Sequence, residues 1–267
     1  MTDPAAVGIG PLWVGTSWKM NKGLTEARLY ARGLSEYLSR TDPSGVQPFI
    51  IPSFTAVAAA RDELGAGSPL LLGVQNAHWE DHGAWTGEVS VMQAKDAGAQ
   101  LVEIGHSERR EHFGETVATT RLKVAAVLAH GLVPLLCIGE SAEVKGAGDS
   151  SGFILEQAAG ALDGLSADEL GRVLIAYEPI WAIGENGRPA TVEELREPFA
   201  DLWREYGGRT GGLLYGGSVS LDNAEDLLGI DHVTGLFIGR AAWHLPGYLR
   251  LLEVAAAHRK ATGSTGG

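Results

Sequence analysis

The chain has 267 residues, of which 45% are hydrophobic, and its formal net charge is −12 at pH 7. Such an acidic protein is not expected to take nucleic acid or an anionic membrane as its main partner, so any attraction for an anionic ligand must be local. The single cysteine, Cys137, excludes an internal disulfide framework and is typical of a protein of the reducing cytoplasm.

Apolar segments with the length of strands alternate with helical patterns through the first half of the chain. Residues 1–11 read as a flexible N-terminal extension that has neither the basic start nor the apolar core of a signal peptide. The predicted strands are residues 12–16, 48–52, 70–75 and 101–104. The predicted helices are residues 24–38, 54–64, 91–97 and 119–130. No apolar run is long enough to cross a membrane.

The same alternation continues in the second half of the chain. Strands are predicted at residues 133–138, at the apolar run that starts at Val173 and ends at Glu178, and at residues 212–215 and 233–238. Helices are predicted at residues 153–162, 192–206, 220–228 and 246–258. Residues 141–152, which are rich in Gly, Ser and Ala, read as a flexible insertion, and residues 259–267 read as a disordered tail.

Eight strand-then-helix units of similar length, with no linker between them, predict a single-domain α/β fold, a closed (β/α)8 barrel over residues 12–258. The alternative is an open Rossmann-like sheet, but no Gly-x-Gly-x-x-Gly motif follows the first strand, where that fold needs it. In a barrel the carboxyl ends of all strands meet at one face, and that face carries the active site.

Glu178 stands at the carboxyl end of a buried strand, where a charge is seldom needed for packing. Pro179 restricts its own backbone and biases Glu178 toward an extended conformation, so the carboxylate leaves the strand on a stiff backbone. Residues 181–190 combine apolar side chains with glycines, which is typical of a loop that closes over a ligand. Thr191 and Glu194 form a capping box that starts the next helix. A salt-bridged surface acid is the alternative interpretation of Glu178.

Polar or glycine residues also follow other predicted strands. Lys19 follows the first strand, His106 follows the fourth, and Ser218 follows the seventh. Gly239 and Arg240 follow the eighth strand. Glycine-rich turns can offer backbone N–H groups to a phosphate at strands seven and eight. Taken singly, these residues have plainer interpretations as a surface lysine, a structural histidine and turn residues. Their meeting with Glu178 at one face predicts a base, an imidazole and an ammonium beside a phosphate site.

Several motifs in this chain resemble the signatures of the triosephosphate isomerase family. They occur in the family's order, cover the chain from about residue 13 to residue 252, and lie at residues 17–21 (SWKMN), 75–79 (QNAHW), 86–88 (TGE), 105–110 (GHSERR), 176–184 (AYEPIWAIG) and 215–219 (YGGSV). The resemblance implies a barrel enzyme that isomerises a small phosphorylated sugar, works without a cofactor or metal, and assembles as a homodimer.

The resemblance also implies a role for each catalytic residue. Glu178 would take a proton from the carbon next to the carbonyl group and return it to the neighbouring carbon. His106 would polarise the carbonyl group as a neutral imidazole at a helix N-terminus, a property for which this family is known. Lys19 would sit beside the substrate oxygens as a fixed cation.

Further residues would bind the phosphate or the neighbouring subunit. The resemblance assigns the phosphate to Gly184, Ser218, Gly239 and Arg240, and it implies that the loop 181–190 closes over the substrate and excludes water. The loop from Trp79 to Thr86 resembles the family's dimer loop.

Three departures from the family pattern cluster around the ligand. Ser17 stands where the family has Asn, which leaves more room beside the substrate. The closing loop is longer, and Arg240 replaces a glycine, so its guanidinium either adds a cation to the phosphate or points away. Because Lys19, His106 and Glu178 are kept, we favour the same chemistry on a four-carbon ketose phosphate, from L-erythrulose 1-phosphate to D-erythrulose 4-phosphate. The alternative is glycolytic triosephosphate isomerase.

Hypotheses of other classes have weaker support. A Schiff-base aldolase would need a lysine near the end of strand six, where the chain has Glu178. A catalytically dead sugar-phosphate sensor would be expected to lose the base or the imidazole. His78 and His82 are spaced like metal ligands but lie in a loop better explained as an interface, so no metal site is predicted. Cys137 reads as core packing.

Overall fold

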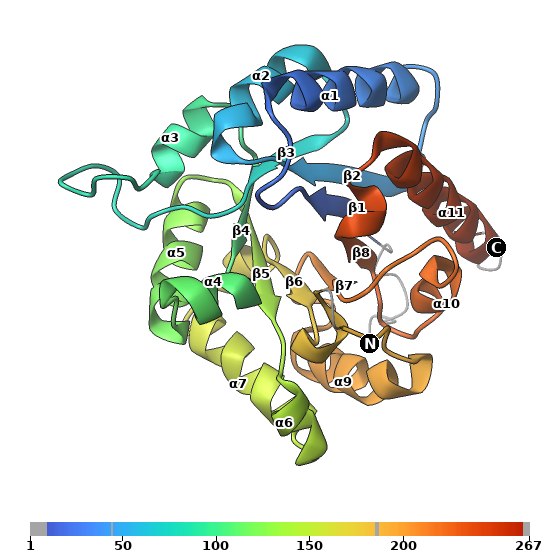
Figure 1. Cartoon of the computed structure of the whole chain (residues 1–267). Coiled ribbons are helices and arrows are strands. Elements are labelled where there is room, and N and C mark those ends of the chain that lie inside the picture. Colours follow the sequence, from blue (N-terminus) through green and yellow to red (C-terminus); the bar gives the residue numbers. More distant parts are fainter. Residues whose placement is uncertain (1–9, 44, 185–186, 264–267) are drawn as a thin grey trace, which may run out of the picture.

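The computed structural model describes residues 10–43, 45–184 and 187–263, and within these residues eight parallel strands close into a barrel (Figure 1). Each strand pairs with the next along the chain, and β8 closes the barrel against β1. The strands are β1 (Leu12–Ser17), β2 (Val46–Ile51), β3 (Leu71–Val74), β4 (Leu101–Ile104), β5 (Val133–Ile138), β6 (Leu174–Tyr177), β7 (Gly212–Tyr215) and β8 (Gly235–Ile238). The predicted fold class is confirmed.

Helices follow the strands and cover the outside of the barrel. They are α1 (Leu24–Leu38), α2 (Val57–Leu64), α3 (Val91–Asp96), α4 (Ser107–Phe113), α5 (Val117–Ala129), α6 (Ala142–Gly146), α7 (Ser150–Leu162), α8 (Ala167–Leu170), α9 (Val192–Tyr206), α10 (Ala224–Leu228) and α11 (Leu245–Gly263). Short 3₁₀ helices cover Phe54–Ala56, Ile180–Ala182 and Arg240–Ala242. None of the described helices is both long and apolar enough to span a bilayer.

Side chains fill the inside of the barrel, so it is a packed core. Because successive side chains of a strand point to opposite faces, one set fills the interior while the other packs under the helices. The interior set is Phe49, Ile51, Leu101, Leu135, Cys137, Leu174, Ala176, Leu214 and Phe237. A Cβ atom on Gly15 would lie 2.2 Å from the Phe49 ring, so only glycine fits there. Cys137 therefore serves as packing, and open space is left to the ends of the strands.

Two segments that were predicted from the sequence to lack regular structure are helical. Residues 141–152 contain α6 and the start of α7, because the Ser141 hydroxyl caps α6 by accepting from the Val144 N–H at 3.3 Å. The predicted tail at residues 259–267 is helical as far as Gly263, because α11 buries Leu251 and Ala255. Residues 1–9 and 264–267 lie outside the described residues, so the remainder of both predicted termini stays a prediction.

Candidate active site

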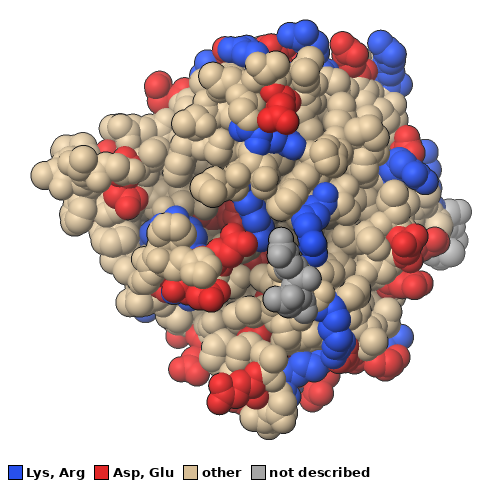
Figure 2. Space-filling view, in the orientation of Figure 1, with Lys and Arg blue, Asp and Glu red and all other residues tan. Residues whose placement is uncertain are grey.

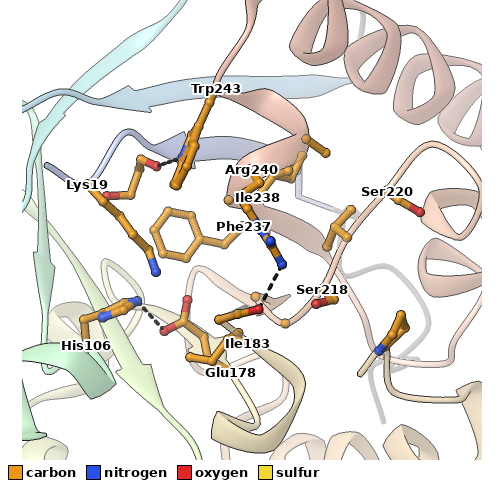
Figure 3. A pocket seen from close by; sticks show the side chains of 18 of the residues that line it. Lys19, His106, Glu178, Ile183, Ser218, Ser220, Phe237, Ile238, Arg240 and Trp243 are labelled. Carbon is orange, nitrogen blue, oxygen red and sulfur yellow. Dashed lines mark hydrogen bonds and ion pairs between the residues drawn. The ribbon is translucent and has the colours of Figure 1, made fainter. Parts of the chain in front are cut away.

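A cavity of about 530 Å³ opens where the strands end, and Figure 2 shows both basic and acidic side chains beside the hollow. Its lining includes every candidate site residue predicted from the sequence, namely Ser17, Lys19, His106, Glu178, Gly184, Ser218, Gly239 and Arg240. Figure 3 shows Lys19, His106 and Glu178 pointing toward one another from different strands. The structure therefore brings all these residues together, while their chemical roles stay predictions.

The turn after β1 holds Lys19 in the cavity wall. Its backbone has a φ of 51°, in the left-handed region that non-glycine residues seldom adopt. The side-chain amide of Gln75 donates to the Lys19 carbonyl oxygen at 2.8 Å. The side-chain amide of Asn21 donates to the Trp18 carbonyl oxygen at 2.8 Å. The ammonium group donates to Glu108 Oε1 at 2.6 Å. Lys19 is thus a positioned cation that has a carboxylate as its neighbour.

His106 caps the N-terminus of α4, and this sets its tautomer. The Glu108 N–H donates to Nδ1 at 3.2 Å, so the proton of the neutral ring lies on Nε2. Burial and, second to it, the charge of Lys19 together lower the pKa of His106 to about 4. Nε2 lies 3.6 Å from Glu178 Oε2. At neutral pH the cavity therefore receives an uncharged imidazole that offers an N–H.

Glu178 follows β6 and is only 4% exposed. Burial raises the pKa of Glu178 well above its usual range, the charge of Glu103 raises it further, and Lys19 opposes both. Its Oε2 atom has no hydrogen-bond partner among the described residues. A Cβ atom on Gly216 would lie 2.6 Å from Glu178 Cγ, so glycine makes room for the carboxyl group. A poorly solvated carboxyl group with a raised pKa is suited to act as a base.

A buried ionic network supports the loop that carries His106. Glu115 accepts from the Gly105 N–H at 2.8 Å, from Arg109 Nε at 2.9 Å and from Lys123 Nζ at 2.5 Å. Burial alone would raise the pKa of Glu115, but Lys123 and Arg109 outweigh it and hold the pKa below its usual value. Lys123 also donates to Asn76 Oδ1 at 2.8 Å. Most of the charges next to His106 therefore serve to hold the loop in place.

The residues expected to bind phosphate lie on the opposite side of the cavity. The Ser218 hydroxyl donates to the Ala182 carbonyl oxygen at 2.6 Å, and Arg240 Nη2 donates to the Gly184 carbonyl oxygen at 2.9 Å (Figure 3). Arg240 therefore reaches across the cavity mouth to the predicted closing loop and does not point away. A Cβ atom on Gly239 would meet nothing within 4 Å, so its backbone faces open space.

The predicted closing loop is anchored at both ends. Trp181 Nε1 donates to Glu140 Oε1 at 2.8 Å, and the Lys145 ammonium lies 3.8 Å from the centre of the Trp181 ring. Thr191 and Glu194 form the predicted capping box of α9, with the Glu194 N–H donating to Thr191 Oγ1 at 3.3 Å. Residues 185 and 186, inside the predicted loop 181–190, lie outside the described residues.

Three residues at the site were not assigned a role from the sequence. Glu108 pairs with Lys19, and its place two residues after His106 could have marked it. Trp243 Nε1 donates to the Ser17 carbonyl oxygen at 3.1 Å, a contact between chain ends that no local pattern indicates. Glu103 is buried on β4. The signal that could have marked it in the sequence is a single acidic residue inside an apolar strand.

Comparison with known proteins gives one family. A family model described as triosephosphate isomerase matches residues 12–255. An L-erythrulose-1-phosphate isomerase of Mycolicibacterium smegmatis is 79% identical over 98% of this chain and 99% of its own length. An L-erythrulose-1-phosphate isomerase of Brucella abortus is 48% identical over 91% of this chain and 96% of its own length. A crystal structure of triosephosphate isomerase from Bartonella henselae superposes with a TM-score of 0.78 at 33% identity, over 91% of this chain and 98% of that chain. The chain therefore belongs to the triosephosphate isomerase family.

Proposed function

We propose that this chain, a sugar-phosphate isomerase of the triosephosphate isomerase family, interconverts L-erythrulose 1-phosphate and D-erythrulose 4-phosphate. The observation that carries the proposal is the meeting of Glu178, His106 and Lys19 in one cavity, in a chain whose relative, 79% identical, bears the name of that activity. The reaction moves a carbonyl group between adjacent carbons and needs a base, a proton donor and charge stabilisation, which these three side chains supply.

In the proposed reaction, Glu178 removes the proton from C3 of the substrate, next to the C2 carbonyl group. His106 donates its Nε2 proton to the carbonyl oxygen as negative charge develops there, and it moves protons between the two oxygens of the enediol. The Lys19 ammonium stabilises the enediolate. Glu178 then returns the proton to C2, which leaves the carbonyl group on the neighbouring carbon. The 3.6 Å between Nε2 and Glu178 Oε2 puts acid and base at adjacent atoms of a bound substrate.

The phosphate is proposed to lie on the other side of the cavity. Gly184 and Gly239 would offer backbone N–H groups, and Ser218 lines the same cavity. Arg240 would supply a cation at the mouth, where it already contacts the Gly184 carbonyl oxygen. A bound phosphate would therefore draw the closing loop and the turn after β8 together and keep water from the enediolate.

The four-carbon substrate is preferred over the three-carbon one because of the room beside Ser17. The Ser17 side chain is short and lies in the cavity wall, and the Ser17 backbone carbonyl oxygen accepts a hydrogen bond from Trp243 Nε1. Two relatives named for the larger substrate support this preference. This chain matches them over nearly their whole length, at 79% and 48% identity. A homodimer in the cytoplasm completes the proposal, supported by the exposed Trp85 side chain in the loop between β3 and α3 and by the single buried cysteine.

Steady-state assays with both substrates test this proposal. We expect kcat/KM for L-erythrulose 1-phosphate to exceed that for dihydroxyacetone phosphate by roughly 100-fold, since a hydroxymethyl group that fills a pocket and finds its hydrogen bond gives at least this discrimination. A preference for the three-carbon substrate would reject the four-carbon proposal and support glycolytic triosephosphate isomerase.

A further inference from the structure

Trp243 is an aromatic residue of the cavity wall that the proposed mechanism does not use. It directly follows the 3₁₀ helix Arg240–Ala242, lines the cavity and is partly exposed. Figure 3 shows its indole ring on the same side of the cavity as Lys19, whereas Ser218 lies on the other side. Trp243 is therefore placed to contact a ligand at the end of the cavity away from the proposed phosphate site.

Hydrogen bonds fix Trp243 against the turn that carries Lys19. Trp243 Nε1 donates to the Ser17 carbonyl oxygen at 3.1 Å, and the Lys22 ammonium group donates to the Trp243 carbonyl oxygen. Ser17 and Lys22 flank Lys19 in the sequence, so the turns after β1 and β8 hold each other. The Trp243 N–H also donates to the Arg240 carbonyl oxygen at 3.2 Å. The indole ring therefore has a defined place in the wall, and no ligand is needed to order it.

The wall that Trp243 presents to the cavity is apolar. An indole ring has one polar hydrogen, and the Ser17 carbonyl oxygen accepts it, so a ligand in the cavity meets only carbon atoms of the ring. A cavity of about 530 Å³ is large enough for either a three-carbon or a four-carbon sugar phosphate. Its size alone does not select between them, so selection needs a contact that only the longer sugar reaches.

We propose that Trp243 is a specificity-determining residue, whose indole ring packs against the terminal carbon of the four-carbon substrate and blocks longer sugars. This inference rests on the proposed function. With the phosphate on the Ser218 side and the reacting carbons beside Lys19, the fourth carbon extends toward the wall that Trp243 forms. A three-carbon sugar ends before this wall. A single methylene group that packs against an apolar surface discriminates by roughly 10- to 200-fold.

Substitutions at Trp243 test the inference through the ratio of kcat/KM for L-erythrulose 1-phosphate to kcat/KM for dihydroxyacetone phosphate. Trp243→Leu is expected to lower this ratio about tenfold, because the smaller side chain no longer covers the terminal carbon. Trp243→Phe keeps an aromatic ring in the wall and should hold the ratio within about threefold of the parent. If three-carbon turnover is too slow to measure, the inhibition constants of erythritol phosphate and glycerol phosphate give the same ratio.

Removal of the indole ring should also admit a longer ligand. A five-carbon pentitol phosphate has no carbonyl group to isomerise and serves as the probe. Relative to glycerol phosphate, it should inhibit Trp243→Leu about tenfold more strongly than it inhibits the parent. A purely structural role of Trp243 would not strengthen binding. Trp203→Leu is the matched control, since Trp203 on α9 packs on His232 instead, with ring centres 4.8 Å apart, and both measures should match the parent.

The outcomes separate this inference from the proposed function. If the parent prefers the three-carbon substrate, the proposed function fails and the inference with it. If the parent prefers the four-carbon substrate but Trp243→Leu slows both substrates equally, only the inference fails, because Trp243 then serves to hold the Lys19 turn. Equal losses of the ratio in Trp243→Leu and Trp243→Phe, or no gain in inhibition by the pentitol phosphate, would also overturn the inference.

Discussion

Glu103 and Glu178 are acids whose neutral forms are favoured by the folded protein. Burial raises the pKa of Glu103 from 4.5 to about 7, and it raises the pKa of Glu178 in the same direction. Between pH 4.5 and 7 the folded protein therefore binds more protons at Glu103 than the unfolded chain does. The contribution of Glu103 to stability therefore falls as the pH rises through that range, and the loss is complete above it.

This sign gives a test of Glu103 that does not depend on activity. The Glu103→Leu variant lacks the titrating group, while Glu178 remains in both proteins. We expect the difference in the free energy of unfolding between variant and parent to grow in the variant's favour from pH 4.5 to pH 7.5, by on the order of 3 kcal/mol. Denaturant unfolding of both proteins across this pH range would measure this difference. A difference that stays constant with pH would contradict the claim that Glu103 is buried and protonated.

The sequence predicted the residues of the site that stand directly after strands. Lys19, His106 and Glu178 could be grouped because the ends of barrel strands must meet. Glu103 could not be placed in the same way, since a residue within a strand faces either the barrel or the helices, and the register that decides this depends on the neighbouring strands. The direction of Arg240 was also open, because its partner is a backbone oxygen of a distant loop.

At the scale of elements, helices with strong local signals were predicted to the residue. The range Val192–Tyr206 of α9 was correct because Thr191 and Glu194 cap it. The start of α10 was predicted at Ser220 but lies at Ala224, because the Asn223 side chain accepts from the Ser220 N–H at 2.8 Å and forms a turn. Composition alone therefore fails where one polar side chain decides between a turn and a helix.

The loop between β3 and α3 projects from the barrel in Figure 1 and belongs to the proposed dimer interface. His78 stacks on Trp79 and contacts Trp85, with ring centres 4.2 and 4.4 Å apart, and Trp85 is 48% exposed. An exposed aromatic side chain on a projecting loop suits insertion into a second subunit.

Sedimentation analysis tests the dimer. We expect the parent to sediment at twice the mass of the chain and Trp85→Glu to shift toward the single chain, because a charge would be buried in the interface. Trp203→Glu is the control, since Trp203 is also partly exposed, at 39%, and its helix α9 lies away from the loop in Figure 1. A parent of single-chain mass, or equal effects of both substitutions, would contradict the proposed interface.

For the whole molecule, barrel closure joins residues that are far apart in the chain. The regular alternation of strands and helices was enough to predict the barrel, because that alternation leaves few other ways to bury every strand. The molecule carries a net charge of −12, yet Lys19 and Arg240 line the cavity at the strand ends, and Figure 2 shows Lys and Arg side chains beside the hollow together with acidic ones. The attraction for a phosphate is therefore local, as the composition required.

Deuterium incorporation from D2O into L-erythrulose 1-phosphate, followed by NMR, tests most directly whether Glu178 moves the proton in this cavity. The parent should place deuterium on the carbon that receives the transferred proton. Glu178→Gln, which keeps the shape of the side chain but cannot act as a base, should slow both exchange and isomerisation by about 1,000-fold or more. A Glu178→Gln variant that exchanges as fast as the parent would contradict the assignment of Glu178 as the base.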